Sequence, residues 1–165
     1  QTIPWSGGKY GIATLSRYPF AGLRRIPLSN QDAGEPRTAL VARVCAAERC
    51  TLVINHHADV RPLAAARSTL EIVADLAPEL GQGVALLADL NQVPQDVGPV
   101  ACSHAGLTDV GASLDDVATQ GGRRIDYAYV DSALAPCIEA FRVQPGTESD
   151  HAALVLDLER SCLPH

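Results

Sequence analysis

The chain has 165 residues, of which 47% are hydrophobic and 19% are charged, and its formal net charge is -6. This length and composition favour one packed globular domain over residues 1–165, and the sequence contains no repeat, low-complexity tract or linker. The acidic balance argues against a protein that grips a long polyanion by bulk electrostatics, because phosphate neutralisation requires clustered Lys and Arg. No stretch is long and apolar enough to span a membrane.

Seven segments are expected to form strands, because they are rich in Val, Ile, Leu and Ala and are bounded by Gly, Pro or Asn. In chain order these are 11–17, 38–45, 50–56, 84–89, 125–130, 139–144 and 152–158. One helix is expected from Pro62 to Ala77, where apolar residues recur at helical spacing and Pro78 follows. The order strand, helix, strand from Leu52 to Leu87 predicts a crossover unit. Residues 92–122, with their prolines and glycines, are predicted to form a loop with room for one short helix.

Basic residues form pairs at two places, Arg24-Arg25 and Arg123-Arg124. The second pair adjoins a run that ends in Asp126. The alternative interpretation is that both pairs are solvated turn residues, and for Arg24-Arg25 this alternative is favoured.

Five cysteines suggest an oxidising compartment, so the protein is expected to be secreted or extracytoplasmic. Cys45 and Cys50 flank four residues between two apolar runs, so a hairpin would bring them face to face. Cys102 and Cys137 form a second candidate pair, which leaves Cys162 alone or paired outside this sequence. Five reduced, mostly buried thiols are an equally good interpretation of the spacing. The absence of a Cys-x-x-Cys pair argues against a zinc site.

Acid, amide and imidazole side chains stand at the ends or beginnings of several predicted strands. The segments are His56-His57, Ala88-Asp89-Leu90-Asn91, Arg124-Ile125-Asp126-Tyr127 and Ser149-Asp150-His151. Side chains at strand ends can converge on a rigid sheet. Carboxylates together with imidazoles are what metal-assisted hydrolysis of a phosphoester requires.

Five stretches, taken in order, resemble the endonuclease/exonuclease/phosphatase superfamily, which includes DNase I, abasic-site endonucleases, sphingomyelinases and inositol-polyphosphate phosphatases. Residues 11–19 resemble the strand that ends in Ser-Arg-Tyr-Pro, and Glu35-Pro36-Arg37 resembles the start of the next strand. The remaining three are Asn55-His56-His57-Ala58-Asp59, Ala88-Asp89-Leu90-Asn91 and Ser149-Asp150-His151. Each stretch alone is a weak signal, but five in the right order are specific.

The resemblance implies an α/β fold, a DNase I-like β-sandwich flanked by helices in four α/β/β/α layers. Family members open with a strand carrying an Asn and another carrying a metal-binding Glu, and here only residues 1–10 precede the Ser-Arg-Tyr-Pro stretch. We therefore expect an N-terminally incomplete domain, the C-terminal two-thirds of the family domain. A longer precursor, with a complementary N-terminal fragment as partner, follows as an expectation.

The resemblance also implies roles. His151 would act as base or phosphate donor, and Asp126 would fix its tautomer and raise its pKa. Asp150 would face a divalent cation, Mg²⁺ or in its place Mn²⁺ or Ca²⁺. Asp89 and Asn91, on one side of an extended segment, would orient water and contribute to the metal site. The last two catalytic candidates are His57 and its supporting acid, Glu35.

Each assignment has a structural alternative. Asp89 to Asn91 could form only an Asx turn, and Asp126 could cap a strand beside Arg124. His151 could be an edge histidine, whereas His56 is expected to point away from the site. Thr108-Asp109 is balanced between support of the site and a turn, and His104 and His165 are interpreted as surface residues.

The leading hypothesis is a divalent-metal-dependent phosphoester hydrolase, most similar to a DNase-type phosphodiesterase. A sphingomyelinase or phosphatase branch shares the same core, and the competing class is a non-catalytic binding module or remnant of the fold. A serine hydrolase is disfavoured, because Ser149 lies in no Gly-x-Ser-x-Gly elbow. The expected substrate is a phosphoester, with nucleic acid as one class.

Overall fold

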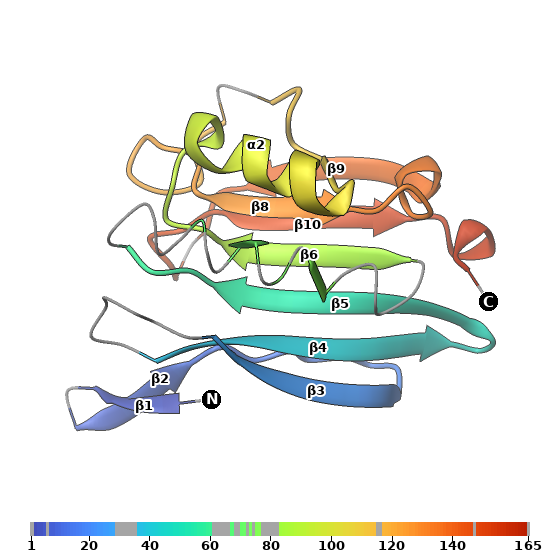
Figure 1. Cartoon of the computed structure of the whole chain (residues 1–165), viewed down its shortest axis with the longest axis horizontal. Helices are drawn as coiled ribbons and strands as arrows, with labels where there is room; N and C mark the ends of the chain where they lie inside the picture. Colours follow the sequence, from blue (N-terminus) through green and yellow to red (C-terminus); the bar gives the residue numbers. More distant parts are fainter. Residues whose placement is uncertain are drawn as a thin grey trace.

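The computed structural model describes residues 2–5, 7–28, 36–60, 67, 70, 71, 73, 75, 76, 83–114, 117–146 and 148–164. Its centre is a six-stranded sheet in the order β3-β4-β5-β6-β8-β7 (Figure 1). The strands are β3 (Phe20–Leu28), β4 (Arg37–Ala46), β5 (Arg49–His57), β6 (Val84–Asp89), β7 (Thr108–Asp109) and β8 (Asp126–Val130). Among the strands that the structure describes, only β5 and β6 pair in parallel, so the crossover unit predicted from Leu52 to Leu87 is confirmed.

Two smaller two-stranded sheets accompany the large one. β9 (Ile138–Gln144) and β10 (Ala153–Leu158) form an antiparallel pair, as do β1 (Thr2–Trp5) and β2 (Gly8–Gly11). Short 3-10 helices, η1 (Ala135–Cys137) and η2 (Arg160–Cys162), precede β9 and follow β10. A mixed sheet facing a second sheet, with few helices, agrees with the predicted sandwich.

The main hydrophobic core lies on the face of the large sheet that α2 (Pro94–Ala105) covers, which we call the outer face; the opposite face is the inner face. Ile54, Leu86 and Tyr127 on the outer face are at most 1% exposed and belong to one buried cluster. α2 contributes Val97 and Ala101 to this cluster and lies over the sheet in Figure 1. Pro94 starts this helix and Gly106, at φ 58°, ends it. The region 92–122, predicted to be loop with room for one short helix, therefore does contain a helix.

The helix expected at Pro62 to Ala77 is described at only six positions, and all six are helical: 67, 70, 71, 73, 75 and 76. Leu70 and Val73 are fully buried in the outer-face cluster. The bounds of this helix lie outside the described residues. Among the described residues, no helix combines the length and apolar character that crossing a bilayer would demand.

The inner face of the large sheet is covered unequally. Ala85 and Val130, on β6 and β8, are buried against Ile138, Leu156 and neighbouring apolar residues of the β9–β10 side. On β3 and β6, however, Leu23 is 66% exposed and Leu87 is 38% exposed. We call the part of the inner face over β6 and β8 the covered half. The part over β3, β4 and β5, which ends at Leu87, is called the open half.

Two sequence expectations about strands need correction. The segment 11–17 is not a strand beyond Gly11, since residues 12–16 have no ladder partner and Leu15 is 94% exposed. Its backbone is held by a side chain instead, because Asn55 Nδ2 donates to the Ala13 carbonyl at 2.8 Å. β3 was not expected, since Arg24, Arg25 and Pro27 mask its pattern. It is an edge strand, where a proline is tolerated, so Arg24-Arg25 is not in a turn.

Two disulfides staple the chain. Cys45 pairs with Cys50 across the β4–β5 hairpin, as one of the two interpretations of the spacing predicted, so the alternative of five reduced thiols is wrong. Cys137 pairs with Cys162, joining the start of β9 to the segment after β10. The predicted Cys102–Cys137 pair and the unpaired Cys162 are therefore wrong. Sequence spacing could not show that β9 and β10 are antiparallel neighbours, which is what brings Cys137 and Cys162 together.

Candidate active site

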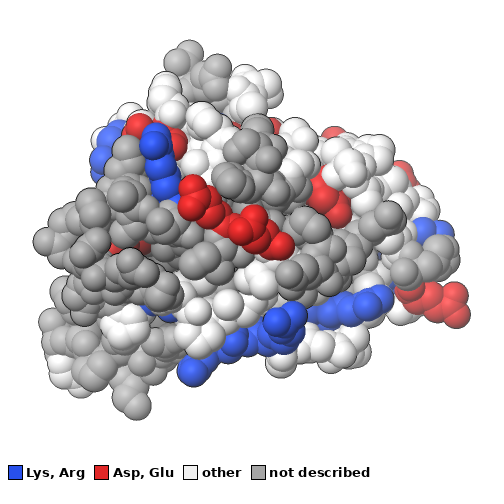
Figure 2. All heavy atoms as spheres, in the orientation of Figure 1, with Lys and Arg blue, Asp and Glu red and all other residues white. Residues whose placement is uncertain are grey.

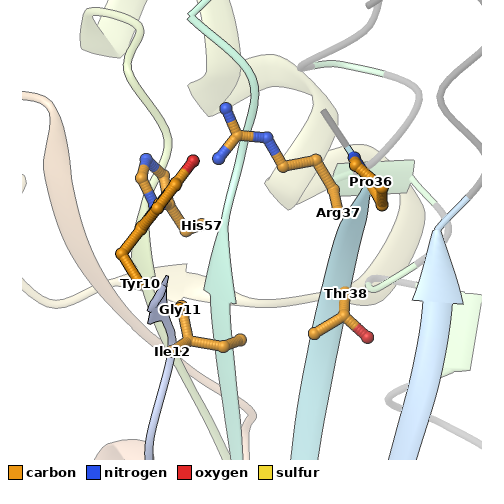
Figure 3. Close-up of a pocket in the computed structure, with 7 residues that line it drawn as sticks. All are labelled: Tyr10, Gly11, Ile12, Pro36, Arg37, Thr38 and His57. Atoms are coloured by element: carbon orange, nitrogen blue, oxygen red, sulfur yellow. The ribbon is translucent and has the colours of Figure 1, made fainter. Parts of the chain in front are cut away.

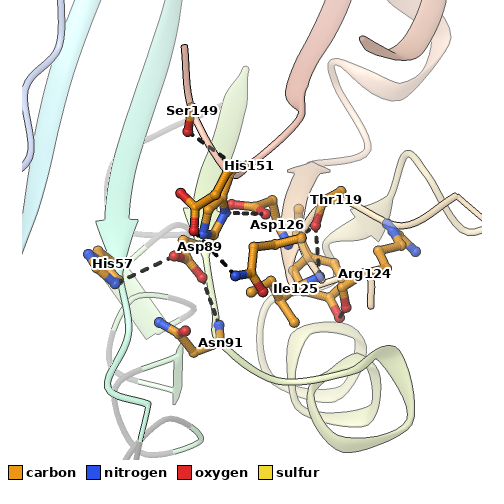
Figure 4. Close-up of polar contacts among 12 residues, drawn as sticks. His57, Asp89, Asn91, Thr119, Arg124, Ile125, Asp126, Ser149 and His151 are labelled. Carbon is orange, nitrogen blue, oxygen red and sulfur yellow. Dashed lines mark hydrogen bonds and ion pairs between the residues drawn. The ribbon is translucent and has the colours of Figure 1, made fainter. Parts of the chain in front are cut away.

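Strand register places three polar side chains in one row. His57 is the register partner of Asp89, and Asp89 is the register partner of Asp126. Register partners on adjacent strands point to the same face. The row therefore lies on the inner face, at the ends of β5 and β6 and the start of β8 (Figure 4). The sequence places these residues far apart, and only the sheet brings them together.

His151 completes the group from just before β10. Its backbone forms an isolated bridge with Gln120, and its Nδ1 lies 2.9 Å from Asp126 Oδ2. Burial lowers the pKa of His151, but the hydrogen bond to Asp126 and the charges of Asp126, Asp89 and Asp150 outweigh it. The net result is a raised pKa. The expected pairing of Asp126 with His151 is present in the structure.

Asp89 occupies the middle of the group. Its Oδ2 lies 3.5 Å from His57 Nε2. Burial raises the pKa of Asp89 and the charge of Asp126 adds to this rise, whereas His57, the Asn91 backbone and His151 oppose it. A carboxylate that is desolvated beside a second carboxylate is stabilised by nearby positive charge.

Asp89, Asp126 and His151 can together hold a metal ion. One potential ligand atom of each lies within 4.8 Å of the others, and all three side chains are partly buried. The two carboxylates are donors that suit Mg²⁺ or Mn²⁺, whereas an imidazole is a poor ligand for Mg²⁺ and is better suited to proton transfer. The fit of these residues to a cation rests on this geometry, whereas the raised pKa of Asp89 is caused first by its burial.

Asn91 lies in a turn rather than on an extended segment. Its φ is 55°, and its backbone N–H donates to Asp89 Oδ1 at 2.9 Å. Its side-chain amide donates to the Ala58 carbonyl at 3.2 Å. The Asx turn considered as an alternative is therefore present together with the cluster. The expectation of an extended Asp89–Asn91 segment is wrong, because β6 ends at Asp89.

Two further candidates lie outside the cluster. Asp150 is exposed, and its Oδ2 lies 3.4 Å from Gln120 Nε2. It is near enough to His151 to raise the pKa of that imidazole, but it is not among the three clustered ligands. Glu35 lies outside the described residues. His56, as expected, points away from the site and is buried on the outer face at 1% exposure.

Thr119 supports the site, although no sequence pattern singled it out. The buried Thr119 hydroxyl accepts hydrogen bonds from the backbone N–H groups of Ile125 and Asp126, at 3.0 and 3.1 Å. Thr119 therefore fixes the start of β8. The only available signal was the tight Gly121-Gly122 turn that follows Gln120.

The contact between Arg124 and Asp109 decides whether Asp109 forms a turn or supports the site, and whether Arg124 is a solvated turn residue. Arg124 is buried, donates to Asp109 Oδ1 at 2.5 Å, and lies 4.7 Å from the centre of the Tyr127 ring. Asp109 also accepts from the Gly111 N–H, so it forms a turn and an ion pair at once. Arg124 is thus a packed residue behind the site, whereas Arg123 is exposed.

The chain matches the model of one known protein family. The sequence model of the "Endonuclease/Exonuclease/phosphatase family" matches residues 2–151. The comparison with curated proteins gives no match.

Solved structures share the fold at low sequence identity. A mannosyl-6-phosphatase of Bacteroides thetaiotaomicron is 18% identical, with a TM-score of 0.66 over 85% of this chain and 66% of that chain. The endonuclease domain of TRAS1, a telomere-specific non-LTR retrotransposon, is 16% identical, with a TM-score of 0.62 over 84% and 81%. A truncated TDP2 of Caenorhabditis elegans is 18% identical, with a TM-score of 0.65 over 83% and 64%.

These matches confirm the DNase I-like fold predicted from the sequence. The chain spans 66% and 62% of the length of two of the matched structures, both from Bacteroides thetaiotaomicron.

Proposed function

This chain belongs to the endonuclease/exonuclease/phosphatase family, and we propose that it hydrolyses phosphoesters with a divalent cation as cofactor. The observation that carries the proposal is the convergence of Asp89, Asp126 and His151, with ligand atoms within 4.8 Å of one another. His57 lies against the same Asp89. This arrangement supplies carboxylates for a cation and an imidazole for proton transfer at one place on a rigid sheet.

Asp89 is the clustered carboxylate that does not accept from His151, so we assign it to the cation, which is proposed to be Mg²⁺, Mn²⁺ or Ca²⁺. Asp150 and Asn91 remain proposed further ligands. Once bound, the cation would neutralise charge that develops on the phosphate oxygens during attack by water. The roles of the remaining residues follow from their own contacts.

His151 is proposed to move the proton. With Nδ1–H donating to Asp126, the imidazole is held in one tautomer and its Nε2 can accept a proton from the attacking water. Oxygen then bonds to phosphorus, and the ester oxygen leaves and takes up a proton. His57 and the turn at Asn91 would fix the orientation of Asp89, through the 3.5 Å contact and the backbone hydrogen bond.

Within this class, we favour a DNase-type phosphodiesterase. One fold neighbour is an endonuclease domain, and the family includes exonucleases and phosphatases as well. Figure 2 shows Lys and Arg side chains gathered along the edge where Figure 1 places β3. Arg24 and Arg25 on β3, and Arg43, which is the register partner of Gly22 of β3, are exposed. In a chain of net charge -6, this local basic surface supports contact with a phosphate backbone.

The direct test is hydrolysis of bis-p-nitrophenyl phosphate and of plasmid DNA by this chain, with and without chelator. Asp89→Ala and His151→Ala should lose activity. Asp157→Asn is the matched control, since Asp157 lies on β10 and pairs with Arg142. Chelator-insensitive cleavage, or a fully active Asp89→Ala variant, would overturn the mechanism. If every variant, including the parent, bound DNA equally and cleaved nothing, the non-catalytic binding module would be the better description.

A mannose 6-phosphate ester and sphingomyelin complete the substrate panel. A mannosyl-6-phosphatase is among the fold neighbours, and the phosphatase and sphingomyelinase branches were alternatives from sequence. Preference for a monoester would move the assignment to the phosphatase branch, because a nuclease must act on a diester.

The open half of the inner face supports the proposal of a complementary N-terminal segment as partner. Leu15, Leu23 and Leu87 expose apolar surface on this side, and a hollow lined largely by apolar atoms lies beside Phe20, Leu23 and Leu40. In a β-sandwich both inner faces are normally buried against each other. A strand-forming segment, in the same polypeptide or supplied separately, would cover this surface.

The two disulfides support a secreted or extracytoplasmic location, because such bonds persist in oxidising compartments. Mass measurement of the native protein with and without thiol alkylation would test this proposal. Free thiols at Cys45 and Cys50 in the native protein would contradict it.

A further inference from the structure

A buried ion pair lies next to the active-site row. Arg37 is the first residue of β4 and Asp59 follows β5 by two residues, and they are 9% and 3% exposed. Arg37 Nε lies 3.7 Å from Asp59 Oδ2. Figure 3 shows the Arg37 guanidinium extending toward His57, with the Tyr10 hydroxyl at the same end of a small hollow that these residues line.

The segment that carries Asp59 also contacts the site. The Ala58 N–H donates to the Asp89 carbonyl at 2.8 Å, and the Ala58 carbonyl accepts from the Asn91 side-chain amide at 3.2 Å. Ala58 is fully buried and is flanked by His57 and Asp59. Residues 57–59 therefore join β5 to the end of β6 and to the turn after it.

We propose that the Arg37–Asp59 ion pair is a positioning element for this site, an inference that rests on the proposed function. By tying β4 to the residue after Ala58, the pair fixes the Ala58 carbonyl, which in turn fixes the Asn91 side chain. The same restraint holds His57 against Asp89. Neither Arg37 nor Asp59 is among the clustered metal-binding candidates, so both act through their neighbours.

The energetics of buried ion pairs separate positioning from simple stabilisation. Desolvation offsets most of the attraction between two buried charges, so replacing both partners with apolar residues of similar volume is often neutral for stability. Removing one partner, by contrast, leaves an uncompensated buried charge. A double apolar variant can therefore keep the fold and lose the geometry.

The test is the double variant Arg37→Met/Asp59→Leu. On bis-p-nitrophenyl phosphate we expect kcat to fall about 10- to 100-fold with KM nearly unchanged, since small misplacements near the chemistry cost rates of this size. The melting temperature should stay within a few degrees of the parent. The NMR signal of the Asn91 side-chain amide, recorded without metal, should move. Arg142→Gln/Asp157→Asn, which removes an exposed pair on β9 and β10, should change none of these values.

A folded double variant with parental kcat and an unmoved Asn91 amide signal would overturn the inference. So would a kcat that fell only in proportion to the folded fraction. If the double variant does not fold, Asp59→Glu keeps the charge pair but lengthens the side chain by one methylene. It should still move the Asn91 signal and lower kcat, and parental values for both would overturn the inference. Should the parent be inactive on every substrate, the proposed function fails, while the Asn91 signal still decides the positioning role.

Discussion

The covered and open halves of the inner face differ in what lies over them, although they belong to the same sheet. In the covered half, Val130 and Leu134 are fully buried against residues of the β9–β10 side. In the open half, Leu23 and Leu87 expose 66% and 38% of their surface. The candidate site lies at the boundary, since Asp89 is on β6 beside the open half while His151 precedes β10. The site therefore takes His151 from the segment that leads into the β9–β10 pair, and its other residues from the large sheet.

The largest expected effect is a loss of activity when the carboxylate at the centre of the candidate site is changed. Asp89→Asn removes the charge at the centre of the group and keeps the shape, so activity on bis-p-nitrophenyl phosphate should fall about 10³-fold or more. The fold should persist, because burial already disfavours the charged form of Asp89. Circular dichroism and the melting temperature would check this. The Asp157→Asn variant provides the matched loss of a carboxylate away from the cluster.

The next prediction compares the two halves directly. Leu134→Ala in the covered half should lower the free energy of unfolding by about 2–5 kcal/mol, because it creates a cavity in a sealed cluster. Leu23→Ala in the open half should change it by less than about 0.5 kcal/mol, since that side chain is already mostly solvated. Urea unfolding followed by circular dichroism measures both values.

Leu23 also reports on the proposed partner segment. When a complementary segment is bound, Leu23→Asp should prevent the complex from forming, although the same change has little effect on the chain alone. Equal effects of Leu23→Ala and Leu134→Ala on the isolated chain would show that the two halves do not differ in the way described.

Much of this architecture could be predicted from local patterns. Six of the seven expected strands are present, because their apolar runs are bounded by turn residues and buried in the sheet. The Cys45–Cys50 pair was predictable because a hairpin determines its own register. β3 was not, because an edge strand needs only one buried face and tolerates Arg24, Arg25 and Pro27. The segment 11–17 has strand-like composition, but most of it has no neighbouring strand with which to pair.

The candidate site was predictable in its members more than in its geometry. His57, Asp89 and Asp126 stand at strand ends in the sequence, but their alignment depends on the register of three strands. Asn91 was placed on an extended segment because residue spacing cannot reveal a positive φ. Thr119 and the Arg37–Asp59 pair contribute through contacts between distant segments, which no local pattern encodes. The catalytic roles themselves remain predictions for the experiments above.

The buried His56 on the outer face of the large sheet predicts that the stability of the fold decreases in acid. Burial lowers the pKa of His56 to about 4, with a backbone interaction at Thr38 opposing and the charges of His57 and Arg37 adding to the decrease. Between pH 6.5 and about 4, His56 is protonated in the unfolded chain and neutral in the folded chain. Stability should therefore fall as the pH drops through this window, on the order of 3 kcal/mol from this residue.

Urea unfolding at a series of pH values would measure this loss, with His56→Leu as the test variant. The variant should show a shallower decrease in stability between pH 6.5 and 4. An unchanged slope would mean that His56 is not the group responsible, and that other residues carry the acid sensitivity of this face.

At the boundary, the direction of the pH effect is the opposite. The Asp126 hydrogen bond and the charges of Asp126, Asp89 and Asp150 overcome burial and raise the pKa of His151. The folded state therefore binds a proton more tightly than the unfolded state. This stabilisation is complete below pH 6.5 and is lost as the pH rises through the raised pKa. If unprotonated His151 is the base, activity should rise with pH over the same range.

Asp126→Asn tests the raised pKa of His151, the smallest of the effects predicted here, because it removes the largest of the interactions that raise that pKa. An NMR titration of the His151 ring in metal-free protein should move to lower pH, and the acidic limb of the rate profile should follow. Asp150→Asn should move both in the same direction but less, since Asp150 makes the weakest of these contributions. If the two variants shifted the titration equally, the hydrogen bond at 2.9 Å would not be what distinguishes Asp126. His151 would then respond to the overall charge of the boundary, and the pairing of Asp126 with His151 would have no special role in proton transfer.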